Sequence, residues 1–327
     1  MKKILKIIGI AVGAIIVLFL GGLGYFSLKY PDVEPAPSIT IESTPERISR
    51  GSYLANHVTL CIDCHSTRDW SKYSAPVIPG TEGKGGEEFN EATVGIPGRI
   101  FASNITPAGI RDYTDGELLR AITTGVTKQG RALFPLMPYL GYNSLAKEDA
   151  YSLVAYIRSL PPIENRTEIS TLDFPVNYIV KTVPLHSYVP SPEPDKSIPV
   201  KYGRYLVTIA GCGDCHTPQV KGERVPGMAF AGGFEFHGPA GTVRSKNITP
   251  DDETGIGGWS KDVFIEMFRT YAKEGSRNIA LDSTGFNTPM PWTMFAGMAD
   301  EDLGAIHEYL RVVPPVHHTV DVFTPKK

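Results

Sequence analysis

The fold of this chain is decided by a short string that occurs twice, as Cys61-Ile62-Asp63-Cys64-His65 and as Cys212-Gly213-Asp214-Cys215-His216. The two copies use all four cysteines of the 327 residues. Two thiols separated by two residues and followed at once by an imidazole form the attachment signature for c-type haem. The thiols can add across the porphyrin vinyl groups, and the adjacent imidazole can then bind the iron from one face. The two strings therefore predict two covalently attached haem c groups.

Three other uses of the cysteines stay open from the string alone. A zinc site needs four ligands, but the pairs lie about 150 residues apart, outside the usual finger spacing. A thioredoxin-like pair would follow a βαβ pattern, which neither copy shows. Two structural disulfides suit an exported chain, but they give no reason for a histidine after each pair. Haem attachment explains all three residues of each string.

The composition predicts a folded protein with many loops. Apolar residues make up 42% and charged residues 20%, and glycine (33) and proline (27) are both frequent. After residue 30 there are 28 basic and 35 acidic side chains, and this balance argues against a nucleic-acid partner. A positively charged redox protein is compatible with it.

The N-terminus predicts a membrane anchor over residues 1–30. Ile7 to Leu28 is an uncharged run of 22 residues behind three lysines, and a helix of that length reaches about 33 Å, enough for a bilayer. A cleaved signal peptide is the alternative, although its apolar core is usually only about 7–15 residues long. The lysines place the N-terminus in the cytoplasm. We therefore expect a single-pass protein of the bacterial cytoplasmic membrane, with the haem domains in the periplasm.

Residues 43–163 and 196–316, called here the first and second half, share a series of landmarks that predicts a duplicated domain. Residues 31–42 then form a tether, 164–195 a proline-rich linker and 317–327 a tail. The landmarks beyond the cysteines recur in one order: Gly51-Ser52-Tyr53-Leu54 with Gly203-Arg204-Tyr205-Leu206, Asn104-Ile105-Thr106-Pro107 with Asn247-Ile248-Thr249-Pro250, Met137-Pro138-Tyr139 with Met290-Pro291-Trp292, and Glu148-Asp149 with Glu301-Asp302.

Each half is predicted to be helical, so the expected fold class is all-α. A first helix begins at Pro45 behind Thr44 as its cap. Middle and closing helices are expected at 115–124, 147–160, 260–271 and 300–313. The closing helices have acids in their first turn, but Ala146 and Ala299 at their N-cap positions are poor caps.

A methionine in each half is the expected second axial ligand of the iron. Met137 is the first half's only methionine, and the repeat selects Met290 among five methionines in the second half. Both stand between prolines, which stiffen the backbone so that little ordering entropy is lost when the iron binds. Methionine–histidine ligation gives the higher potentials of cytochromes c. The alternative for each methionine is plain core packing.

Six other histidines could bind iron, but none recurs at a matching position in both halves: His57, His186, His237, His307, His317 and His318. Asn104 and Asn247 could donate to a haem propionate or could hold the turn that follows them. These alternatives stay open at the level of sequence.

These strings, the Asn-Ile-Thr-Pro segments and the Met-Pro-aromatic segments resemble the multi-haem cytochrome c subunits of bacterial membrane-bound alcohol, aldehyde and gluconate dehydrogenases. The resemblance covers both halves. It implies two tandem class I cytochrome c domains, each with histidine and methionine on the iron. It also implies electron transfer from a periplasmic dehydrogenase towards quinone or an oxidase. Those subunits usually have three haem domains and are attached near the C-terminus, whereas this chain has two and an N-terminal apolar run.

The sequence thus predicts a dihaem electron carrier with redox proteins as partners: a dehydrogenase, a quinol-oxidising complex or a terminal oxidase. Its site residues are Cys61, Cys64, His65 and Met137, then Cys212, Cys215, His216 and Met290. A dihaem enzyme, peroxidase-like or sulfur-compound-oxidising, is the alternative. Such an enzyme commonly needs an open or exchangeable iron position.

Overall fold

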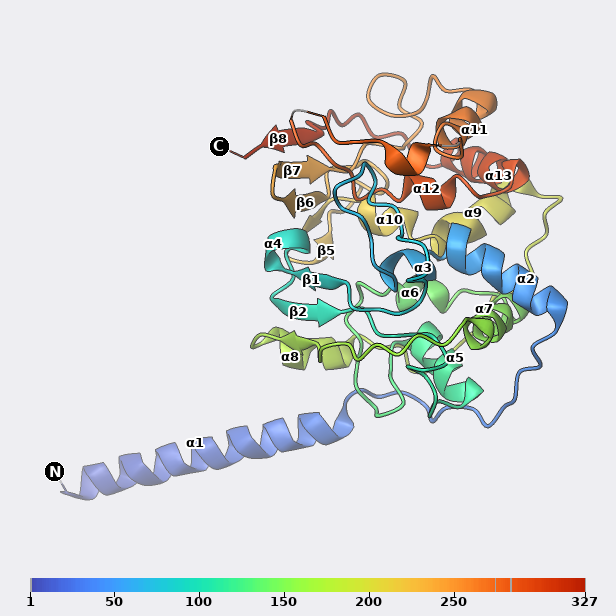
Figure 1. Cartoon of the computed structure of the whole chain (residues 1–327). Coiled ribbons are helices and arrows are strands. Elements are labelled where there is room, and N and C mark those ends of the chain that lie inside the picture. Colours follow the sequence, from blue (N-terminus) through green and yellow to red (C-terminus); the bar gives the residue numbers. More distant parts are fainter. Residues whose placement is uncertain (1, 274, 283, 327) are drawn as a thin grey trace.

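A computed structural model describes residues 2–273, 275–282 and 284–326, and it is mainly helical with three small sheets. α1 (Lys2–Lys29) is one continuous helix that projects from the rest of the molecule, with no buried residue (Figure 1). It is long and apolar enough to cross a membrane. Length and composition of this kind suit a membrane anchor or a signal sequence.

The two halves carry their main elements in the same order. The first half and the segment after it contain α2 (Pro45–Tyr53), η1 (Leu54–Val58), α3 (Cys61–Cys64), β1 (Glu88–Asn90), α4 (Glu91–Val94), β2 (Gly98–Phe101), α5 (Asp115–Thr124), α6 (Tyr139–Tyr142), α7 (Lys147–Ser159), β3 (Thr171–Leu172), α8 (Val176–Ile179) and η2 (Val180–Thr182). The second half and the tail contain α9 (Pro199–Ile209), α10 (Cys212–Cys215), β4 (Gln219–Val220), β5 (Glu223–Arg224), β6 (Glu235–Gly238), β7 (Gly241–Arg244), α11 (Lys261–Arg269), η3 (Ser276–Asn278), α12 (Trp292–Phe295), α13 (Asp300–Leu310) and β8 (Phe323–Pro325).

The fold class expected from the sequence needs a correction, because the chain is mainly helical and not all-helical. Each half has an antiparallel three-stranded sheet, β1-β2-β3 and β6-β7-β8. The third strand comes from the expected linker in one case and from the expected tail in the other. β6 and β7 form a hairpin whose two-residue turn, Pro239-Ala240, lies between Gly238 and Gly241. Such a turn favours a hairpin, and phenylalanine, threonine and valine in the strands favour extended backbone.

The predicted helices lie close to their observed positions. α2 begins at Pro45, and the Thr44 hydroxyl accepts a hydrogen bond from the Arg47 amide. α5 has the expected bounds, and Thr114 and Glu117 form a capping box at its start. α11 starts one residue later than expected because Ser260 is its N-cap. α7 and α13 end somewhat earlier than expected, at Ser159 and Leu310.

Glycine allows the first and closing helices of each half to cross closely. A Cβ atom at Gly51 of α2 would lie 1.9 Å from the Ser152 carbonyl oxygen of α7. The equivalent Cβ at Gly203 of α9 would lie 1.8 Å from the Ala305 carbonyl oxygen of α13. Both distances are far inside van der Waals contact, so only glycine permits these crossings. This explains the glycine of the repeated Gly-x-Tyr-Leu segment.

The tyrosine of the same segment reaches into the other half. Tyr53 donates to Asp302 Oδ2 over 2.6 Å and accepts from the amide of Ala299, 3.0 Å away. Tyr205 donates to Asp149 Oδ2 over 2.6 Å and accepts from the amide of Ala146, 3.1 Å away. Each hydroxyl therefore caps the closing helix of the other half, which has no side-chain cap of its own.

One hydrophobic core runs through both halves. It includes Leu54 and Leu153 of the first half and Leu206 and Leu303 of the second, all fully buried. The halves are consequently packed together, and the two Cys-x-x-Cys-His strings are held in one body.

Candidate functional site

Both strings occupy the same local structure, a one-turn helix entered through a left-handed residue. Leu60 (φ 55°) precedes α3, and Gly211 (φ 65°) precedes α10. The left-handed residue turns the chain sharply after the preceding helix. Glycine adopts this conformation freely, whereas leucine does so at a cost of about 1–3 kcal/mol. The first half therefore keeps the same turn at Leu60 although leucine disfavours it.

The two histidines that end the strings have their rings fixed in the same way. His65 Nδ1 lies 2.7 Å from the carbonyl oxygen of Ser103, and His216 Nδ1 lies 2.7 Å from that of Lys246. A carbonyl oxygen only accepts, so Nδ1 carries the proton in both rings. Nε2 is left with its lone pair free. A histidine that binds a metal typically donates its other N–H to a carbonyl in this manner.

The protonation of both strings suits haem attachment better than a redox dithiol. Burial lowers the pKa of His65 and of His216, so both imidazoles stay neutral, the form that binds iron. Burial raises the pKa of Cys64 and Cys212 to about 12. It raises the pKa of Cys61 as well. A thioredoxin-type pair depends on a lowered thiol pKa, which is the opposite of this environment.

The two methionine candidates stand immediately before α6 and α12, each one residue before the proline that precedes the helix. In each half the carbonyl of the methionine accepts a hydrogen bond from the amide two residues later. Tyr139 N donates to Met137 O over 2.7 Å, and Trp292 N donates to Met290 O over 2.8 Å. Both side chains are half-buried at the edge of the core.

Other methionines of the second half have a different setting. Met294 and Met298 are 4% and 2% exposed, and they are part of the core. Their packing accounts for them without iron, which supports the choice of Met290 from the repeat.

The six other histidines each lie beside a protein group. Four meet an oxygen through Nδ1: His57 with Met294 O, His186 with Asp32 O, His237 with Thr242 Oγ1 and His318 with Ala231 O. His307 is buried, with Nε2 3.1 Å from Trp259 O. His317 lies beside the carboxylates of Asp251 and Glu253. His57, which the sequence placed on a helix, packs where the halves meet, against Gly297.

Asn104 and Asn247 hold the turns that carry the histidine-binding carbonyls. The Asn104 side-chain oxygen accepts from the amide and the hydroxyl of Thr106, at 2.9 and 2.7 Å. Asn247 makes the same pair of bonds with Thr249, at 2.9 and 2.8 Å. Ser103 and Lys246 directly precede these asparagines. The sequence alone did not single out Ser103 or Lys246, because every residue has a backbone carbonyl and the residue type does not show which one accepts from a histidine.

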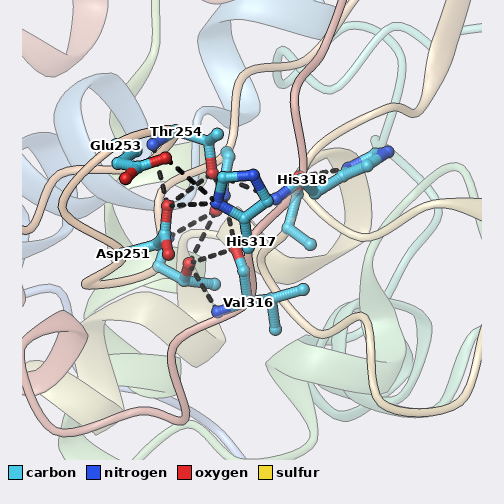
Figure 2. A network of polar contacts seen from close by, with 9 residues as sticks. Asp251, Glu253, Thr254, Val316, His317 and His318 are labelled. Carbon is cyan, nitrogen blue, oxygen red and sulfur yellow. Dashed lines mark hydrogen bonds and ion pairs between the residues drawn. The ribbon is translucent and has the colours of Figure 1, made fainter.

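The tail of the second half reinforces its histidine turn through a series of hydrogen bonds. Thr254 donates to Asp251 and accepts from the amide of His318, as Figure 2 shows. The His318 ring in turn donates to the carbonyl of Ala231. The next amide, that of Gly232, donates to the carbonyl of His216 over 2.8 Å. A chain of bonds therefore connects the tail to the residue that would bind the iron.

A continuous cavity of about 2820 Å³ passes through both halves. In the first half it is lined by Cys61, Cys64, His65 and Met137, so the structure brings these four predicted residues to one space. In the second half it is lined by Cys215 and by Pro289 and Pro291, which flank Met290, whereas Cys212, His216 and Met290 are not among its lining residues. Ordinary small-molecule pockets are roughly 300–1,000 Å³. The size of the space, the free Nε2 of His65 and the thiols that line it fit a large apolar group such as haem.

Comparison with known proteins gives several cytochrome c relatives, although no protein-family model matches the chain. A dihaem c-type cytochrome of Cereibacter sphaeroides is 30% identical over 265 residues, covering 78% of this chain and 82% of that protein. The cytochrome c subunit of the quinone-dependent alcohol dehydrogenase of Gluconacetobacter polyoxogenes is 28% identical, covering 82% of this chain and 56% of the subunit.

The gluconate 2-dehydrogenase cytochrome c subunit of Pantoea cypripedii is 27% identical, covering 95% of this chain and 67% of that protein. The chain thus spans little more than half of the alcohol dehydrogenase subunit. These relatives confirm the resemblance that was drawn from the residues of the two strings and their repeats.

Proposed function

This chain belongs to the dihaem c-type cytochromes, and from that premise we propose that it is a membrane-anchored electron carrier with two covalently bound haem c groups. One observation carries the proposal above the others. Each Cys-x-x-Cys-His string ends in a histidine whose Nδ1 proton is held by a backbone carbonyl, at 2.7 Å in both halves. The free Nε2 is the atom that an iron requires.

The residue roles follow from the site. Cys61 and Cys64 form the thioether links of the first haem, and His65 Nε2 and Met137 bind its iron. The corresponding residues of the second haem are Cys212, Cys215, His216 and Met290. Haem supplies a one-electron iron couple when bound, and the protein sets its potential through the axial ligands, burial and nearby hydrogen bonds.

Two tandem class I cytochrome c domains are the proposed architecture. The repeated order of elements supports domain boundaries at 43–163 and 196–316. The strands β3 and β8 lie beyond those boundaries and pair with the sheets of the respective halves. The segments 164–195 and 317–327 therefore connect the domains and also complete their sheets.

The proposed setting is the outer face of the cytoplasmic membrane, with α1 as a retained anchor. Several relatives are cytochrome subunits of dehydrogenases. By analogy the electron donor is a periplasmic dehydrogenase or a quinol-oxidising complex, and the acceptor is a downstream redox protein. The acidic surface beyond residue 30 suits a partner with a basic docking face.

A redox titration of ligand variants tests the proposal. Met137→His and Met290→His should each lower one of two potentials and leave the other in place, because methionine ligation favours ferrous iron. Met228→Leu changes a methionine outside the proposed ligand set and should alter neither. Haem quantification should give two groups per chain. A single haem, or carbon monoxide and cyanide binding by the resting protein at ordinary levels, would instead support an enzyme with an open iron.

A further inference from the structure

A loop of the first half reaches across to the methionine loop of the second. The amide of Tyr73 donates to Ile279 O over 2.9 Å. The side chain of Asn287 donates to the carbonyls of Trp70 and Lys72, at 3.2 and 3.0 Å. The ring of Tyr73 stacks on that of Tyr271, with centroids 6.0 Å apart. The loop formed by residues 69–75 is therefore fixed to the segment that leads to Met290.

Ser74 stands at the centre of this contact. Its hydroxyl donates to the carbonyl oxygen of Met290 over 2.6 Å and accepts from the amide of Trp292, 2.9 Å away. Its own amide donates to Asn287 Oδ1 over 2.8 Å. The side chain thus bridges the backbone on both sides of Pro291. One serine of the first half holds the turn on which the second half presents its methionine.

The backbone of Ser74 is strained where these bonds form. Its φ is 64° and that of Ala75 is 42°, both in the left-handed region, and Ser74 is 3% exposed. Residues other than glycine rarely occupy this region because it costs them free energy, and strain of this kind gathers at functional sites. The bonds to Asn287, Met290 and Trp292 offset that cost.

The first half has no equivalent bridge within the part of the chain that the structure describes. There the Met137 carbonyl accepts from the Tyr139 amide alone, whereas the Met290 carbonyl accepts from the Trp292 amide and also from the Ser74 hydroxyl. The connection between α5 and α6 is 125–138, whereas the connection between α11 and α12, which includes η3, is the longer one, 270–291. A longer connection has more conformational freedom to lose, and contacts from the other half reduce that freedom before the iron binds.

We propose that Ser74 is a positioning residue for the second iron, so that the first half fixes the coordination of the haem held by the second half. The proposal rests on the function proposed above, in which Met290 binds that iron. Ser74 acts through the Met290 backbone and does not touch the haem ligand atom. Losing its hydroxyl should release the methionine loop and weaken the Met290–iron bond.

The test compares Ser74→Ala and Ser74→Gly with Ser71→Ala in the full-length haem-loaded protein. Ser71 lies in the same loop, and its hydroxyl donates to Asp69 and not to the methionine loop. A neutral hydrogen bond contributes about 0.5–1.5 kcal/mol, so either Ser74 variant should raise the ratio of unbound to bound Met290 about two- to twelvefold. Carbon monoxide competing for the ferrous second haem measures that ratio. The ring-current-shifted methyl signal of each bound methionine shows which haem has changed.

Amide exchange at Trp292 provides a readout that is independent of the iron. It should quicken in both Ser74 variants and stay unchanged in Ser71→Ala. Equal effects of alanine and glycine would assign the role to the hydroxyl, because glycine also relieves the strained φ. Wild-type carbon monoxide binding and wild-type Trp292 exchange in Ser74→Ala would overturn the proposal. A Met290→His protein that keeps both shifted methyl signals would overturn the Met290 ligation itself.

Discussion

The two halves place the same aspartate of the Cys-x-x-Cys-His string in different surroundings. In the first half Asp63 is 4% exposed and pairs with Arg68, which also binds Glu87. In the second half Asp214 pairs with Arg224 at the surface, and both side chains are about half exposed. The histidine geometry is nevertheless the same in both halves. The comparison indicates that the string and the carbonyl that orients its histidine must be kept, whereas the ion pair beside it can move between core and solvent.

The close helix crossings are the most stringent shared feature, and breaking them should have the largest effect. Gly51→Ala and Gly203→Ala should each lower the free energy of unfolding by about 3 kcal/mol, because the added methyl meets backbone that cannot yield. Denaturant unfolding measures the loss. Gly304→Ala is the control on α13, where the new methyl makes ordinary contacts with the ends of two side chains, Lys261 at 3.4 Å and Ile265 at 4.0 Å. Wild-type stability in either variant would mean that the helices do not cross at this distance.

Removing the hydroxyl of each capping tyrosine, Tyr53 or Tyr205, should destabilise the protein by different amounts in the two halves. Asp302 is held by Tyr53 and Tyr202, and its nearest cation, Lys196, lies 4.0 Å away, whereas Asp149 receives two hydrogen bonds from Arg50, one of them over 2.7 Å. Tyr53→Phe should therefore cost about 2–3 kcal/mol of unfolding free energy, and Tyr205→Phe, whose aspartate keeps its arginine, about 1–2 kcal/mol.

Thermal unfolding of the two variants measures this difference. Tyr151→Phe serves as the control, since that hydroxyl has no hydrogen-bond partner in the part of the chain that the structure describes. The reverse order of the two costs would show that Arg50 does not compensate for the lost phenol.

The smallest expected effect lies in the sheets. Glu88 receives two bonds from Arg99, and Arg99 lowers the pKa of Glu88 to about 2. Because this is below the usual value of 4.5, the pair contributes stability above pH 4.5 and loses it as the pH falls towards 2. The stability difference between wild type and Glu88→Gln should therefore shrink over that range.

The corresponding pair of the second half gives the comparison. Arg244 makes one hydrogen bond to Glu235. Its Nη1 atom donates to Asp321 O and Thr324 Oγ1 on the β8 side of the sheet. Glu235→Gln should accordingly change stability less than Glu88→Gln. Unfolding measured from pH 6 to pH 2 decides this, and a pH-independent Glu88→Gln effect would argue against the pair.

Local patterns in the sequence predicted much of the helical fold. The middle helix of the first half was expected after Tyr113 at its observed bounds, and the capping box that starts it acts within one turn. The small sheets were not predicted, because β3 pairs with β2 across some seventy residues, Thr171 lying opposite Arg99. Their strands are two to four residues long, too short to show a period in the sequence. Ala146 and Ala299 looked like poor caps for a related reason, since each cap comes from the other half.

What the sequence by itself determined is the chemistry that fits within a few residues: the paired thiols with their histidine, the apolar N-terminal run and the repeated Met-Pro segments. Covalent attachment and helix formation depend on spacing along the chain, so both can be predicted from the order of residues. Only the tertiary structure decided which carbonyls hold His65 and His216, which tyrosine caps which helix and where Ser74 lies. Those contacts join residues that are distant in sequence, and they exist because two halves of similar shape share one core.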